Sequence, residues 1–155
     1  QTNVPLYNTF VVVEFVLVLL MARAQQPRWS KAMAVVAVLG IAGFAFNALF
    51  VDPRKEMLFE GTVWISFLLA CVISALLWRM ANTIGQDLRT VPAFWLFTAM
   101  GVYFIALPPV IGLARSLRAD LHLASTIWTI MPVLCTIRYL LAAYAFWIEG
   151  NRSRT

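Results

Sequence analysis

The chain of 155 residues is 62% hydrophobic and only 12% charged, and its formal net charge is +5. Because soluble domains are about 45–50% apolar and about 25% charged, these values exclude a water-soluble globular fold and predict an integral membrane protein with the lipid bilayer as its partner. The positive charge does not indicate nucleic-acid binding, since the basic residues stand in short connections between apolar runs rather than on one helix face.

Five apolar segments predict an all-α, polytopic transmembrane helical bundle that forms one domain over residues 1–155. None of them shows the alternation of a membrane β-strand, and hydrocarbon admits only helices or closed barrels. The predicted spans are residues 6–22, 32–51, 61–78, 92–112 and 121–148.

The first span carries an acid, Glu14, at its middle. A charged side chain at this depth costs about 2.5–3.5 kcal/mol on insertion scales, so it should be met inside the protein. Tyr7 lies two turns earlier on the same helical face. Asn8 lies toward the outer end of the span, where it is expected to hydrogen-bond across helices or to a ligand.

The second span is rich in small residues. Gly40 and Gly43 allow a neighbouring helix to approach closely, which favours packing within the bundle over a dimer interface. Asn47 lies toward the outer end of this span and has the same two possible uses as Asn8. In the fourth span, Pro108 and Pro109 are expected to kink or end the helix.

The fifth span carries the only deep base, Arg138. Trp128 and Cys135 share its helical face, and these two are candidates for ligand contact or packing. Pro132 lies near the middle of the predicted span, where it should kink the helix. Such a kink serves a hinge, a ligand niche or, more commonly, static packing.

Glu14 and Arg138 form a candidate intramembrane ion pair. At 1.5 Å per residue, their depths agree to within about 5–8 Å. Three interpretations stay open. The pair is structural and docks the first helix on the fifth, or it is functional, as a coupling site, proton relay or switch. In the third, the two do not pair, and each side chain meets a partner chain or the interface.

Several chemistries are excluded by what the chain lacks. His122 is the only histidine, so a bis-histidine haem, a zinc site or a histidine-based catalytic centre cannot form within one chain. Lys31 and Lys55 are the only lysines and both lie in loops, which excludes a Schiff base to retinal. No nucleotide-binding or hydrolase motif occurs. We therefore predict no catalytic residues, no metal and no cofactor.

Orientation follows from the positive charges of the connections. Residues 23–31, residues 79–91 and the C-terminal tail share one side of a five-span bundle and contain seven Lys and Arg, against four on the other side. This bias predicts a bacterial inner-membrane protein with its N-terminus outside and its C-terminus in the cytoplasm.

The segments YNTFVVVEFVLVLL, FNALF and RYLLAAYAFW together resemble a group of uncharacterised bacterial multi-pass proteins. In that group a helix with the pattern Asn-x5-Glu, here Asn8 and Glu14, opens a bundle of about seven helices. The resemblance implies that two N-terminal helices precede this segment. It implies no reaction.

Taken together, these features favour a non-catalytic membrane module rather than an enzyme. We expect a sensory or accessory subunit that binds an apolar ligand or partner helices, and a membrane protein partner or a homo-oligomer is compatible with it. The alternative is a transporter or proton-coupled component using Glu14. A membrane enzyme acting on lipid is the third reading.

Overall fold

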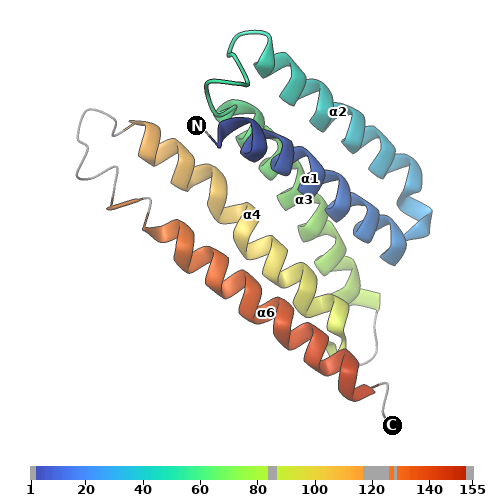
Figure 1. Cartoon of the computed structure of the whole chain (residues 1–155). Helices are drawn as coiled ribbons and strands as arrows, with labels where there is room; N and C mark the ends of the chain where they lie inside the picture. The colour runs from blue at the N-terminus through green and yellow to red at the C-terminus, as the bar shows by residue number, and fades with distance from the viewer. Residues whose placement is uncertain (1–2, 84–86, 117–125, 128, 153–155) are drawn as a thin grey trace. The chain divides into compact units, whose positions relative to one another are not determined.

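The computed structural model describes residues 3–83, 87–116, 126–127 and 129–152, and within them the fold is all-α, as predicted (Figure 1). Five helices are long and apolar enough to cross a membrane. The elements in chain order are α1 (Val4–Gln25), η1 (Pro27–Trp29), α2 (Ser30–Ala48), α3 (Phe59–Thr83), η2 (Leu88–Thr90), α4 (Pro92–Ser116) and α6 (Ile130–Arg152).

Prolines mark the starts of several helices. Pro5 stands in the first turn of α1, Pro27 opens η1 and Pro92 opens α4. The first turn of a helix tolerates proline because its N–H groups have no intrahelical acceptor. At η2 the side chain of Asp87 accepts a hydrogen bond from the backbone N–H of Arg89 and so caps that short helix.

The structure differs from two expectations about proline. Pro108 and Pro109 do not end α4, which continues to Ser116; the kink expected there stays a prediction. Pro132 does not kink the middle of a helix, because α6 begins only at Ile130 and Pro132 therefore falls in its first turn. Of the expected fifth span, residues 121–148, the part from Ile130 onward lies in α6, which continues to Arg152; residues 121–125 and 128 lie outside the described residues.

The chain divides into two compact units. The N-terminal unit comprises Gln1–Leu69, and the C-terminal unit comprises Ala70–Thr155, so that α3 contributes its first part to one and its second part to the other. The prediction of a single domain over residues 1–155 stays a prediction.

In the N-terminal unit, α1 and α2 run antiparallel and side by side (Figure 1). Their close approach depends on Gly40, because a Cβ atom there would lie 2.2 Å from Cζ of the fully buried Phe15. At Gly61 of α3 an added Cβ would lie 2.8 Å from the ring of Phe44. Missing side chains at these positions therefore make room for aromatic rings of the core.

In the C-terminal unit, α4 and α6 lie side by side along most of their lengths (Figure 1). The indole of Trp95 on α4 meets the ring of Tyr144 on α6 edge to face, with 5.1 Å between ring centroids. Tyr144 in turn stacks on Trp147 at 5.7 Å. This aromatic chain joins the two helices by contacts that need no polar partner in hydrocarbon.

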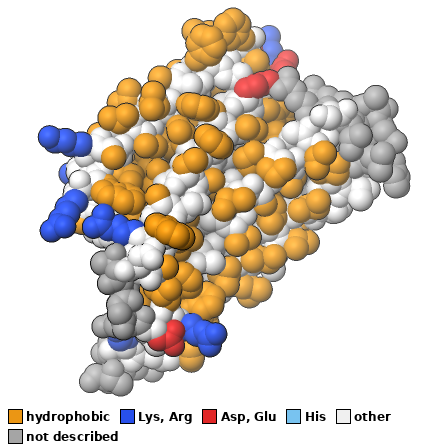
Figure 2. Space-filling view, turned by 180° about the vertical axis from the view of Figure 1, so that it is seen from behind, with side chains coloured by type: hydrophobic (Ala, Val, Ile, Leu, Met, Phe, Trp, Pro, Cys, Tyr) orange, Lys and Arg blue, Asp and Glu red, His pale blue; other side chains and the backbone are white. Residues whose placement is uncertain are grey.

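The helix surfaces are largely apolar. Figure 2 shows hydrophobic side chains over most of the face in view, with Lys and Arg gathered near its edges. Helix α6 is the least buried of the five candidate spans, and its buried residues are Leu134 and Ala145. Such faces are stable against lipid tails or against apolar helices, and not against water.

Candidate functional site

Asn8 makes three hydrogen bonds through its side chain. It is 5% exposed, and its Nδ2 donates to the carbonyl oxygens of Pro53 at 2.9 Å and Glu56 at 3.1 Å. Its Oδ1 accepts from the backbone N–H of Leu58 at 3.1 Å. Leu58 immediately precedes α3, so Asn8 ties α1 to the connection between α2 and α3 and satisfies backbone groups there.

Asn47 makes a similar connection from the end of α2. Its Oδ1 accepts from the backbone N–H of Gly61 at 3.2 Å, and its Nδ2 donates to Oε2 of Glu60 at 3.1 Å. Both acceptor and donor positions lie in the first turn of α3, whose N–H groups lack intrahelical partners. The two predicted asparagines are therefore used by the fold, in hydrogen bonds between elements.

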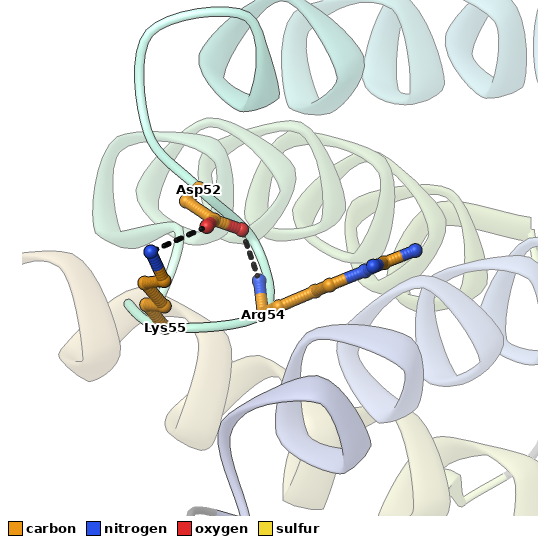
Figure 3. A network of polar contacts seen from close by, with 3 residues as sticks. All are labelled: Asp52, Arg54 and Lys55. Atoms are coloured by element: carbon orange, nitrogen blue, oxygen red, sulfur yellow. Dashed lines mark hydrogen bonds and ion pairs between the residues drawn. The ribbon is translucent and has the colours of Figure 1, made fainter.

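The connection that Asn8 holds contains a small polar network (Figure 3). Oδ1 of Asp52 accepts from the backbone N–H of Arg54 at 3.0 Å, and Nζ of Lys55 lies 3.7 Å from Oδ2 of Asp52. The side chain of Arg54 extends away from both other residues in Figure 3. Because Asp52 and Lys55 are solvent-exposed, the ion pair contributes little stability; the network shapes a turn.

Glu14 lies at the middle of α1 with a half-buried side chain and a carboxylate oxygen, Oε1, that is inaccessible. It interacts electrostatically with Tyr7, which lies two turns earlier on the same face of α1. These two predicted residues therefore share a partly buried polar position within an otherwise apolar helix.

Arg138 lies among aromatic rings of the C-terminal unit. Its guanidinium carbon is 4.7 Å from the ring centroid of Tyr103 on α4, and 5.8 Å from those of Phe104 and Tyr139. A cation over an aromatic face gains about 2 kcal/mol or more when water is excluded. The aromatic faces thus supply part of the stabilisation that a deep arginine requires. Aromatic partners for Arg138 were not predicted from the sequence.

The remaining predicted residues are Cys135, Pro132 and Trp128 of the fifth predicted span. Cys135 is half-buried on α6 and has a free thiol. The carbonyl oxygen of Pro132 accepts a hydrogen bond from Oγ1 of Thr136 at 2.8 Å. Trp128 lies outside the described residues. Glu14 and Arg138 belong to different units, and their pairing stays a prediction.

A groove between α1 and α2 was not predicted from the sequence. It encloses about 160 Å³, and a second cavity of about 430 Å³ adjoins it at the turn between the helices. Both are lined by Leu20, Arg23 and Ser30. The other residues lining the groove are Val16, Leu19, Met33, Ala34 and Ala37.

Small side chains on α2 create this groove. Ala34 and Ala37 face the larger Val16 and Leu20 of α1, so the helices leave space between them near the turn. The signal in the sequence is the alanine-rich start of the second span, to which Ala34 and Ala37 belong. Among the described residues, no group of three or more His, Cys, Asp or Glu side chains is placed to hold a metal ion.

Comparison of the chain with known protein families, curated proteins and solved structures found no match. The resemblance to a seven-helix bacterial group carried by Asn8 and Glu14 therefore stays a prediction.

Proposed function

We propose that the chain is a non-catalytic integral membrane module, a sensory or accessory subunit, that binds an apolar ligand in the groove between α1 and α2. The groove is the observation that carries this proposal. Its walls are the side chains of Leu19, Met33 and their apolar neighbours, and about 150 Å³ of apolar cavity suffices for a molecule of benzene size. The exposed faces of α2 and α6 would accept lipid or the helices of a partner.

The use of the polar side chains supports binding over transport or catalysis. The hydroxyl groups of Thr62, Ser66 and Thr98 each donate to the carbonyl oxygen four residues earlier in the chain. Asn8 and Asn47 are engaged with the α2–α3 connection and the start of α3. These groups stabilise helices and connections, and a path for water or ions requires polar groups directed into a common space.

The orientation and the membrane belong to the same proposal. Arg28 lies in the connection between α1 and α2, and Arg23 and Lys31 lie at the helix ends beside it; this positive charge would place the connection on the cytoplasmic side of a bacterial inner membrane. The N-terminus would then lie outside and the C-terminus in the cytoplasm.

Photolabelling tests the proposal. An uncharged alkyl diazirine added to the protein in lipid nanodiscs should label residues 16–37, and A34F should abolish most of this labelling by filling the groove. A45F is the matched control, since Ala45 is also an exposed alanine of α2 but does not line the groove. Equal labelling of the two variants at residues 16–37 would refute ligand binding in the groove.

A proton-coupled transporter is the second candidate, favoured by the inaccessible carboxylate oxygen of Glu14. E14Q separates the two functions. If E14Q folds with unchanged stability and loses proton-coupled uptake in vesicles, transport is supported; if it only impairs assembly, Glu14 is structural.

A further inference from the structure

The polar end of the groove indicates what kind of apolar ligand would enter it. Arg23, in the last turn of α1, and Ser30, the first residue of α2, both line the groove and the adjoining cavity. The apolar walls extend seven residues from Arg23 back to Val16 on α1, about 10 Å along the helix axis. The site is therefore amphipathic, with a cationic end at the turn and an apolar wall leading away from it.

The charge at this end is uniformly positive. Arg23, Arg28 and Lys31 lie within nine residues, and the sequence contains no acidic residue between Glu14 and Asp52. Arg23 and Arg28 are exposed, so they attract anions at the membrane surface. A phosphate diester matches the guanidinium of Arg23 and the hydroxyl of Ser30. A headgroup with a net negative charge is favoured over a zwitterionic one, because the positive charges attract the whole headgroup without an ammonium group that they repel.

The volume of the groove suits part of one acyl chain. The groove of about 160 Å³ resembles in size the apolar cavity of about 150 Å³ that takes up benzene, so it holds about six carbon atoms. The cavity of about 430 Å³ at the turn is large enough for a headgroup. An amphiphile bound in this way has the same orientation as the surrounding lipids, with its headgroup toward water and its acyl chain toward the hydrocarbon.

We infer that the groove binds an anionic phospholipid, with its phosphate on Arg23 and Ser30 and one acyl chain between Leu20, Met33 and Ala37. This inference rests on the proposed function, because it names the ligand of the same groove. A lipid held there couples the α1–α2 pair to the anionic lipid content of its leaflet, which is a signal suited to a sensory or accessory module.

Retention of defined lipids tests the inference. The full chain is reconstituted in nanodiscs of phosphatidylcholine with one-fifth phosphatidylglycerol, released into detergent, and its bound lipids are counted by native mass spectrometry. Preferential retention of phosphatidylglycerol is expected, and R23Q should reduce that preference about fivefold, the effect of one basic side chain near an anionic surface. R23K should keep most of the preference.

Controls separate the possible failures. R89Q removes one exposed charge from another connection and should leave the preference unchanged. Because R23Q retains the apolar walls, it should still be labelled by the uncharged diazirine. Equal retention of both lipids by the unmodified protein would overturn the phospholipid inference, and so would displacement of the lipid by glycerol phosphate alone. In either case, diazirine labelling at residues 16–37 would still support the proposed function. Loss of the A34F effect on labelling would refute the proposed function itself.

Discussion

Replacing Asn8 by alanine is expected to destabilise the N-terminal unit more than any other single change of a polar side chain in α1. The substitution removes three hydrogen bonds, to Pro53, Glu56 and Leu58. At about 0.6 kcal/mol per bond in membrane proteins and up to about 1.5 in buried sites, the loss amounts to about 2–4 kcal/mol. Unfolding of the protein in detergent micelles, followed by circular dichroism against increasing sodium dodecyl sulfate, measures it.

The charge variant N8D makes the test stricter. Aspartate keeps an oxygen for the N–H of Leu58, but it places a carboxylate against the carbonyl oxygens of Pro53 and Glu56, where Nδ2 donates now. N8D should therefore be at least as destabilised as N8A at neutral pH. T9A is the control, since Thr9 is exposed and bonds only to Pro5 within its own helix; its effect should stay within about 0.5 kcal/mol. A loss below that value for N8A would refute the role assigned to Asn8.

Three further outcomes follow from the packing and the charges. G43A should destabilise the N-terminal unit by about 1–3 kcal/mol, because the new Cβ would lie 2.3 Å from Cδ1 of Trp64 and disturb the hydrogen bond from the indole N–H of Trp64 to the carbonyl oxygen of Leu39. G112A is the control and should not destabilise the protein, because there is open space around Gly112. Equal melting temperatures of the two variants in detergent would contradict this prediction. A double-mutant cycle of Y103L and R138M should give a coupling of about 1–2 kcal/mol from the cation–ring contact, and additive losses of stability would disprove that contact. If Glu14 and Arg138 pair, the exchange E14R/R138E should restore the assembly lost in E14R alone, as judged by size-exclusion chromatography; a double variant as defective as the single one would exclude pairing.

The site was only partly predictable, for reasons visible at individual residues. Asn8 and Asn47 were recognised as polar groups near span ends, but their hydrogen-bond partners lie 45–50 and 13–14 positions away along the chain. No periodicity within a span reveals such partners. The groove could not be predicted, because it depends on the size of the α1 side chains opposite Ala34 and Ala37, which the sequence of α2 alone does not reveal.

Proline and arginine show the same dependence on context. Pro132 was assigned to mid-helix because apolar runs do not reveal where a helix begins, and the start at Ile130 turned it into a first-turn proline. Arg138 was predicted to pair with Glu14, the only deep acid, because the sequence reveals where charges lie along the chain. It does not reveal which aromatic rings of another helix lie beside Arg138. Packing of α4 against α6 brought Tyr103 and Phe104 to it.

By itself, the sequence determined an all-α fold with helices of membrane-spanning length and hydropathy, of which the described part of the chain has five. This is a local property, because about 20 apolar residues and the need to satisfy every backbone hydrogen bond in hydrocarbon suffice for it. Only the tertiary structure decided that Asn8 and Asn47 hold the start of α3, that Arg138 meets aromatic faces, and that α1 and α2 enclose a groove ending at Arg23. Each of these depends on which side chains of different helices lie opposite one another, which hydropathy summed along one helix does not encode.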